Sequence, residues 1–305
     1  MNAPVSSIEG FIEIALSRDI DGRCVPTITS TRPFNLPRTF VGKSAETVAA
    51  SVGLLFSLCG QAQRAASLGA LEAAMGLPVA EDVLKTRAQA VRAEAIREAV
   101  LRSNPDFGSA VRKVVQQAHR VAEAAKPAFV LGSQTSIDLS GDLDALADLA
   151  RPLVGRRTGL LSDHGIAELT PDSLADADLL PNGLDDSGLA DMPTVNGEPR
   201  WTRGAISQGD TPLYAYRLGA FGWGVASVLT ARGLLTHAAR VNDGVVTAYR
   251  ITAPTEWNFH PKGIVAKALA MLPTNTDWVA GARVIVDAID PCVEAHIRFE
   301  EPSHA

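Results

Sequence analysis

The most informative stretch of this sequence spans residues 231–263 and reads ARGLLTHAARVNDGVVTAYRITAPTEWNFHPKG. Two runs rich in apolar and β-branched residues flank the tripeptide Asn242-Asp243-Gly244. An Asp-Gly pair between two such runs is a strong signal for a tight turn, because glycine readily adopts the positive φ that these turns need. We therefore predict a β-hairpin over residues 234–252.

The segments around this hairpin are predicted to be helical. Downstream, we expect helices over residues 263–271 and from Thr276, as N-cap, to Ile289, where the sequence Asp-Pro-Cys ends the second helix. Upstream, the pattern from Leu213 to Leu229 also predicts a helix, although its glycines allow a break or a close backbone approach. Residues 155–210 are rich in Gly, Pro, Asp and Ser without a period, which predicts an irregular insertion.

The N-terminal part of the chain is predicted to be a strand followed by helices. Residues 8–16 read IEGFIEIAL, a composition typical of a strand. The helical segments that follow are expected over residues 44–75, 80–102, 109–125 and 141–151. The whole pattern indicates an α+β fold that is predominantly helical.

Composition excludes several classes of partner. The 28 Lys and Arg against 34 Asp and Glu give a net charge of −6, which argues against nucleic acid or an anionic membrane surface. The longest apolar stretch is interrupted by Ser and Gly and is too short to cross a bilayer. The N-terminus lacks the pattern of a secretory signal, and three cysteines fit reduced thiols. We therefore expect a cytoplasmic protein that binds neither membrane nor nucleic acid.

The residues alone give few chemical signals. Cys59 is predicted near the middle of an apolar helix, where a free cysteine is usually inert core. Cys292 follows an Asp-Pro pair at a helix end, and both a structural and a functional role stay open for it. Cys24 is interpreted as structural or incidental. The sequence has no zinc-hydrolase His pair, nucleophile elbow, phosphate loop or dinucleotide fingerprint.

The order of several motifs resembles the large subunit of nickel–iron hydrogenases. That family has an R-G-x-x-x-H segment, a D-G hairpin, a P-[ST]-x-W-N turn and a terminal D-P-C-x-x-C, which resemble residues 232–237, the hairpin, residues 254–258 and residues 290–295. SIEGFIEI (residues 7–14) resembles its R-I-E-G-H strand, and SLCGQAQ (residues 57–63) resembles its R-x-C-G-x-C helix. The resemblance implies a single large-subunit-like domain over residues 1–305, with core blocks at about 7–130 and 211–298.

The departures from the family pattern imply a loss of enzyme activity. In the enzyme, each C-x-x-C supplies two thiolates to a nickel–iron centre, and the second cysteine of each pair bridges both metals. Here the first cysteine of each pair is present, as Cys59 and Cys292, but the second position is Ala62 or Ala295. The resemblance thus implies no catalysis and no nickel. Three hypotheses for the function remain: a metal-carrying scaffold, a metal-free chaperone and a relic redox enzyme. The relic enzyme is the least favoured.

The residues that face iron in the family are better preserved. By resemblance, Arg232 matches the arginine above the metal centre, and Thr255 matches the hydroxyl residue that, with it, hydrogen-bonds iron-bound cyanide. Asp290 is the aspartate of D-P-C, and Glu9 falls at the proton-relay glutamate. Asp106 matches another aspartate more loosely.

A truncated relative with one cysteine per motif resembles the HupK/HoxV-type hydrogenase expression/formation proteins. This resemblance implies a scaffold in which Cys59 and Cys292 transiently hold the Fe(CN)2CO unit, which then passes to the large subunit of an uptake hydrogenase. The implied partners are the hydrogenase large-subunit precursor and the small hydrogenase maturation chaperones. The alternative is a metal-free chaperone for the immature large subunit, which would not need both thiols.

Overall fold

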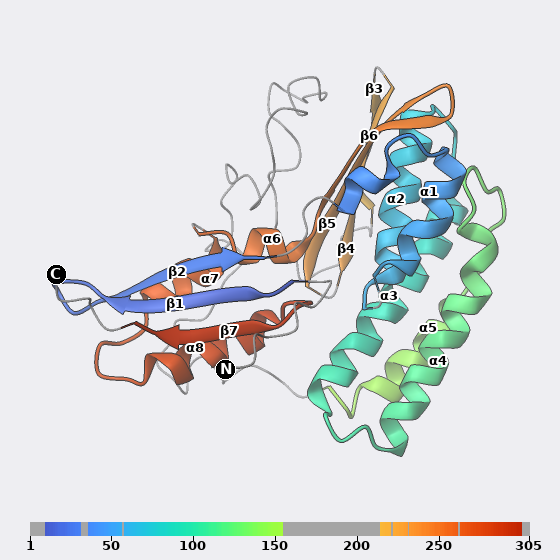
Figure 1. The fold of residues 1–305 in the computed structure, drawn as a ribbon. Coiled ribbons are helices and arrows are strands. Elements are labelled where there is room, and N and C mark those ends of the chain that lie inside the picture. The colour runs from blue at the N-terminus through green and yellow to red at the C-terminus, as the bar shows by residue number, and fades with distance from the viewer. Residues whose placement is uncertain are drawn as a thin grey trace, which may run out of the picture.

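The fold is described from a computed structural model of the chain (Figure 1). It describes residues 10–31, 36–56, 58–154, 214–220, 222–230, 232–261 and 263–300, with the backbone alone for residues 214–220. The predicted insertion at 155–210 lies outside the described residues. Among those described, no helix is both long and apolar enough to span a membrane.

A three-stranded sheet joins the two ends of the described chain. Its order is β2 (Cys24–Ser30), β1 (Ile12–Arg18) and β7 (Ala295–Phe299). β1 runs antiparallel to β2 and parallel to β7, and Ile12 pairs with Ala295. The predicted N-terminal strand is therefore confirmed, although it begins later than expected, at Ile12. This pairing places the residues after Cys292 beside β1.

The second sheet is an antiparallel meander of four strands. Its order is β3 (Tyr214–Ala220), β4 (Trp223–Thr230), β5 (Gly233–Asn242) and β6 (Val245–Thr252). The predicted hairpin is confirmed as β5 and β6, with Asp243 and Gly244 at positive φ in the turn. The helix predicted over 213–229 is wrong, because the described residues of this segment form β3 and β4.

The burial of β4 explains this error. Every residue from Trp223 to Val228 is buried. A strand buried on both faces lacks the alternation of apolar and polar residues that identifies a half-exposed strand. Gly224 packs directly on the neighbouring helix, since a Cβ there would lie 1.9 Å from the Ala70 carbonyl oxygen.

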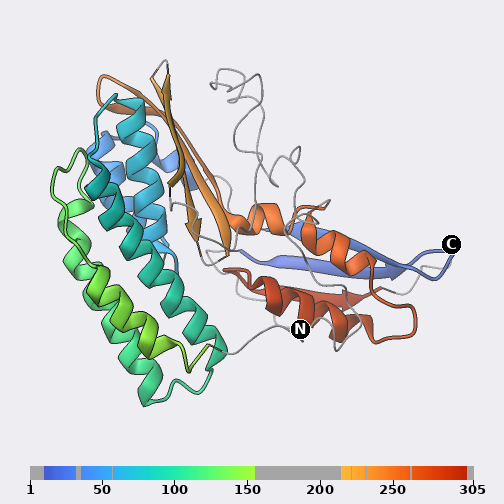
Figure 2. The same ribbon diagram turned by 180° about the vertical axis from the view of Figure 1, so that it is seen from behind.

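Helices cover this sheet and extend away from it (Figures 1 and 2). They are α1 (Ala45–Ser51), α2 (Gly60–Ala74), α3 (Glu81–Ser103), α4 (Ser109–Ala125) and α5 (Ser140–Ala150). Ser44 caps α1 as predicted, accepting a hydrogen bond from the Thr47 backbone nitrogen. The single helix predicted over 44–75 is wrong: a 3-10 turn (Val52–Leu54) and a loop separate α1 from α2.

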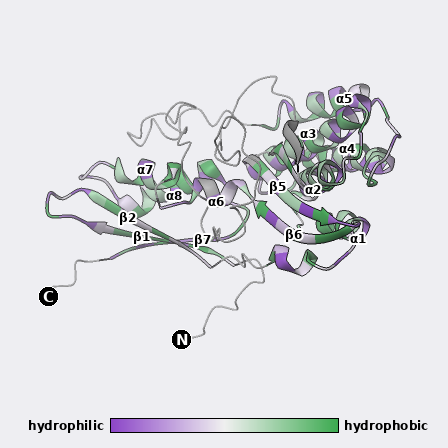
Figure 3. Cartoon of the chain, turned by 90° about the horizontal axis from the view of Figure 1, so that it is seen from above, coloured by the Kyte–Doolittle hydropathy of each residue, from purple (hydrophilic) through white to green (hydrophobic). Residues whose placement is uncertain are grey.

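Short helices follow the meander. They are α6 (Pro254–Asn258), α7 (Ile264–Ala270) and α8 (Trp278–Ile289). Figure 3 shows α7 and α8 on the same side of the three-stranded sheet. The helices predicted over 263–271 and up to Ile289 are confirmed. The N-cap of α8 is Asp277 rather than Thr276, because Asp277 accepts hydrogen bonds from the Val279 and Ala280 nitrogens.

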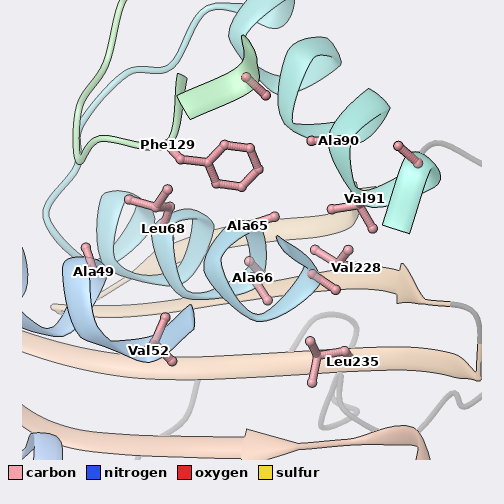
Figure 4. Close-up of a cluster of buried hydrophobic side chains, with 14 of the residues drawn as sticks. Ala49, Val52, Ala65, Ala66, Leu68, Ala90, Val91, Phe129, Val228 and Leu235 are labelled. Atoms are coloured by element: carbon pink, nitrogen blue, oxygen red, sulfur yellow. The ribbon is translucent and has the colours of Figure 1, made fainter. Parts of the chain in front are cut away.

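Two clusters of buried apolar residues stabilise these layers. The larger fills the space between α1–α5 and the meander: Ala66 of α2 lies on the side of Val228 and Leu235, and Leu68 lies near Phe129 (Figure 4). The smaller lies between the three-stranded sheet and α7 and α8 and includes Trp278. The α+β, mostly helical fold class is confirmed, and the single-domain organisation stays a prediction.

Candidate functional site

Cys59 lies at the N-terminus of α2, not in the middle of a helix as predicted. It is the N-cap residue, half-buried, and its sulfur accepts a hydrogen bond from Gln63 Nε2 at 3.6 Å. The chain reaches this position by folding back tightly: a Cβ on Gly60 would lie 3.0 Å from the Gly53 carbonyl oxygen. The loop that interrupts the predicted long helix therefore brings the cysteine to a helix end.

A buried carboxylate caps the same end of α2. Glu94 of α3 accepts hydrogen bonds from the backbone nitrogens of Gln61, at 2.7 Å, and Ala62, at 3.1 Å. Burial raises the pKa of Glu94 to about 7, even though these two bonds lower it. Glu94 thus satisfies backbone groups that a helix terminus leaves unpaired.

Cys292 follows the C-terminus of α8. Asp290 caps that helix in the left-handed conformation, with φ 56°, which turns the chain sharply. The hydroxyl of Thr255, from α6, is hydrogen-bonded to the Cys292 sulfur at 3.3 Å. Thr255 is buried and Cys292 half-buried. The structure therefore brings the predicted Thr255 and Cys292 into direct contact.

Arg232 connects this turn to the rest of the site. It lies between β4 and β5, and its Nε is 2.9 Å from the Asp290 carbonyl oxygen and 3.0 Å from Asp290 Oδ2. Its Nη2 donates to Glu98 of α3 at 3.3 Å. Arg102, one turn further along α3, donates to Asp290 Oδ2 at 2.5 Å. Asn258 of α6 donates to the Arg232 carbonyl oxygen, which holds the turn in place.

Electrostatics link the two thiols to Arg232. Burial raises the pKa of Cys59 to about 12; the Gln63 hydrogen bond and Arg232 lower it, while Glu94 and Cys292 raise it further. Burial alone would lower the pKa of Arg232, but Asp290, Glu98 and Cys292 together raise it. The guanidinium of Arg232 thus acts electrostatically on both cysteines, which places Cys59 and Cys292 near the same arginine.

The remaining predicted residues have different outcomes. Glu9 lies outside the described residues. Asp106 is exposed in the turn after α3. Ala62 is fully buried in α2, and Ala295 begins β7. Within the described ranges, no group of three or more His, Cys, Asp or Glu side chains is placed to hold a metal ion.

Sequence reasoning missed the contribution of α3. Glu94, Glu98 and Arg102 follow one another at intervals of four residues, so they share one face of the helix. Both glutamates are nearly fully buried, at 7% and 6% exposure. The spacing was visible in the sequence, but only the fold shows that this charged face is directed to the two cysteine motifs.

Comparison with known proteins identifies the family. No protein-family model matches the chain. The NAD+-reducing [NiFe]-hydrogenase has the same fold, with a TM-score of 0.51 and 14% identity over 90% of this chain and 94% of its own. HupK of Rhizobium leguminosarum bv. viciae is 27% identical over 96% of this chain and 97% of its own. HupV of Azotobacter chroococcum mcd 1 is 30% identical over 91% of this chain and 94% of its own. The chain belongs to the HupK/HupV/HoxV family of hydrogenase expression/formation proteins.

Proposed function

We propose that this protein is a non-catalytic scaffold that holds an Fe(CN)2CO unit between Cys59 and Cys292. It passes the unit on to the large-subunit precursor of a nickel–iron hydrogenase, working with small maturation chaperones. The observation that carries the proposal is the convergence of both motif cysteines with Arg232 and Thr255. The names of the relatives, hydrogenase expression/formation proteins, support a role in maturation.

The number of protein ligands suits this cargo. An Fe(CN)2CO unit brings three diatomic ligands of its own, so two thiolates are sufficient to attach it. Thiolates are soft ligands, so they bind an iron that carries cyanide and carbon monoxide in preference to hard cations that favour oxygen ligands. The enzyme's second pair of thiolates is replaced by Ala62 and Ala295, and nickel would have no bridging ligand. Two attachment points instead of four also favour release, which a scaffold requires.

Arg232 and Thr255 can recognise the cyanide ligands. Cyanide nitrogen carries negative charge and accepts hydrogen bonds, which guanidinium and hydroxyl groups donate. Arg232 uses Nε and Nη2 for Asp290 and Glu98, and in the described part of the chain its Nη1 makes no hydrogen bond. The ion pairs therefore fix the guanidinium and leave one edge for a ligand.

The raised pKa of Cys59 links loading to proton release. At neutral pH the free sulfur is a thiol, since burial raises its pKa to about 12. A metal ligand must be deprotonated, so the incoming iron displaces this proton. Loading is thus favoured as pH rises, and acid favours release of the unit.

A metal-free chaperone is the second candidate. It is favoured by the likeness of the fold to a nickel–iron hydrogenase over 90% of the chain. Such a protein would imitate the large-subunit fold in order to bind the immature subunit or its chaperones. Under this view, substitution of either cysteine would leave binding to the partners unchanged. No metal would be lost, because none is bound.

Iron analysis after anaerobic purification from a host with the maturation machinery tests the proposal. We expect stoichiometric iron in the parent protein and in Cys24→Ala, whose cysteine is buried outside the site. Cys59→Ala and Cys292→Ala should lose the iron. An iron-free parent that still co-purifies with the large subunit would contradict the scaffold and support the metal-free chaperone.

A further inference from the structure

An unbroken chain of buried hydrogen bonds leads from the Cys59 sulfur into the protein core. Gln63 Nε2 donates to the sulfur, and Gln63 Oε1 lies 2.8 Å from His237 Nε2. On the other side of the ring, His237 Nδ1 lies 2.8 Å from the Tyr249 hydroxyl, which is 2.7 Å from Ser67 Oγ. All four residues beyond the cysteine are buried. Among the five residues of this line, Cys59 alone is half-exposed.

The elements of the larger core make this alignment possible. Gln63 and Ser67 are one turn apart on α2, while His237 and Tyr249 come from β5 and β6. The rings of His237 and Tyr249 meet edge to face, with centroids 5.7 Å apart. Buried polar groups are costly unless each is paired, and apolar side chains could fill the same interface. A line of paired polar groups ending at a thiol therefore needs an explanation other than packing.

Because the His237 ring is neutral, one ring nitrogen donates a hydrogen bond and the other accepts one. This choice sets the donor and acceptor of every other hydrogen bond in the line. Burial lowers the pKa of His237 to about 3, so at neutral pH its ring has one N–H and one lone pair. If Nε2 carries the hydrogen, it donates to Gln63 Oε1, and the amide N–H remains directed to the sulfur. The Tyr249 hydroxyl, which is placed as a donor to Ser67 Oγ, must in this order turn its hydrogen to Nδ1 and accept from Ser67.

The opposite order is also self-consistent. If Tyr249 donates to Ser67, then His237 Nδ1 donates to Tyr249, and Nε2 becomes an acceptor. The Gln63 amide must then rotate to present its N–H to the ring and its oxygen to Cys59. The tautomer of His237 and the direction of the hydrogen bond at the sulfur are therefore coupled through Gln63.

We propose that His237 is a positioning residue for Cys59: with its hydrogen on Nε2, it holds the Gln63 amide so that the amide N–H is directed to the sulfur. A sulfur that attaches iron accepts this bond, which stabilises its negative charge. The use of the sulfur rests on the proposed function, but the positioning itself can be measured on the metal-free protein.

Two substitutions of His237 separate positioning from packing. In His237→Gln the side-chain amide reaches the place of Nε2 and can still hold Gln63. In His237→Asn the amide reaches only the place of Nδ1, so it retains Tyr249 and loses Gln63. Gln63→Met, of similar length, removes the donor itself. The readout is the rate at which iodoacetamide modifies each cysteine, measured by peptide mass spectrometry, with Cys292 as the internal reference.

We expect His237→Asn and Gln63→Met to slow the modification of Cys59 about threefold relative to Cys292. Loss of the donor removes a hydrogen bond of about 1 kcal/mol from the attacking sulfur, and the greater nucleophilicity of that sulfur offsets part of the loss. His237→Gln should stay within about 1.5-fold of the parent, because it retains the donor.

Three results would overturn the proposal. They are an unchanged Cys59 rate in both His237→Asn and Gln63→Met, an equal slowing in His237→Gln and His237→Asn, or a parallel change at Cys59 and Cys292, which would indicate general loosening. If the expected pattern is found in a protein that never carries iron, the proposed scaffold function fails while the positioning role of His237 stands.

Discussion

The Nε atom of Arg232 lies 2.9 Å from the main-chain oxygen of Asp290, a residue 58 positions further along the chain. This bond joins the turn between β4 and β5 to the C-cap of α8. It therefore connects the two hydrophobic clusters, because the meander belongs to the larger and α8 to the smaller. Arg102 donates to the same aspartate, so one carboxylate fixes two arginines from different elements.

Neutralising Asp290 should weaken both the fold and the site. Asparagine tolerates the left-handed backbone at this position, so Asp290→Asn removes charge without adding strain. We expect the free energy of unfolding to fall by about 1–2 kcal/mol in urea titrations, since the hydrogen bond from Arg102 loses its charged acceptor and the ion pair with Arg232 is lost. Asp148→Asn, which breaks the exposed pair with Arg151, should change it by less than about 0.5 kcal/mol. Equal effects in the two variants would contradict the account.

Thr255→Val tests the hydroxyl that contacts Cys292. Valine has nearly the same shape, and the buried site should keep its fold. Losing one hydrogen bond of about 1 kcal/mol should speed the loss of iron from loaded protein about fivefold in anaerobic dialysis. Thr247→Val, at an exposed position on β6, is the control and should lose iron at the parental rate. Equal rates in both variants would exclude Thr255 from the binding of the iron unit.

The ion pair of Arg87 and Glu72 should be essential for stability but not for the site. Both side chains are fully buried, and Arg87 also donates to the Ala128 carbonyl oxygen. Arg87→Met leaves a buried carboxylate without its partner, and we expect a loss of about 3–5 kcal/mol in urea unfolding. The double variant Glu72→Met/Arg87→Met should recover at least about 1 kcal/mol of that loss. A double variant less stable than the single would show that the unpaired charge of Glu72 does not cause the destabilisation of Arg87→Met.

Glu94 should make stability fall as pH rises. Burial raises its pKa from 4.5 to about 7, opposed by Arg97 and supported by Glu98, so the folded state binds more protons than the unfolded state between these values. The free energy of unfolding therefore decreases through this range, by up to about 3 kcal/mol. The lowered pKa of His237 acts in the opposite direction below 6.5.

A comparison with Glu94→Gln isolates this effect from other titrating groups. Urea unfolding at about pH 5 and about pH 8 gives, for each protein, the change in the free energy of unfolding between the two pH values. The parent should lose more stability toward the higher pH than the variant does, because the variant has no carboxylate to ionise. Identical pH dependence in the two proteins would show that Glu94 is not held protonated.

The hairpin and most helices could be predicted because local signals and tertiary structure agree. Asp243-Gly244 lies between two runs of β-branched residues, and it forms the predicted turn. β4 could not be recognised, since its residues are buried on both faces and show no alternation. Its Gly224, which weakens any local signal, is needed for contact with Ala70 of α2. That requirement exists only in the folded protein.

The sequence named candidate site residues but not the framework that holds them. Motif order identified Cys59, Cys292, Arg232, Thr255 and Asp290, and the structure brings these together. The sequence just before Cys59 is mostly apolar, which concealed the break that makes it a helix N-cap. The partners on α3 and the line from Gln63 to His237 depend on packing between distant segments, and no local pattern specifies such contacts.

The central claim is that Cys59 and Cys292 together hold an iron unit carrying cyanide and carbon monoxide. Infrared spectroscopy of anaerobically purified protein tests it most directly, because the stretching bands of both ligands lie in a region free of protein absorption. We predict these bands in the parent and in Cys24→Ala, and their loss in Cys59→Ala and in Cys292→Ala. Bands that persist in either of the last two variants, or that are missing from the parent, would contradict the account.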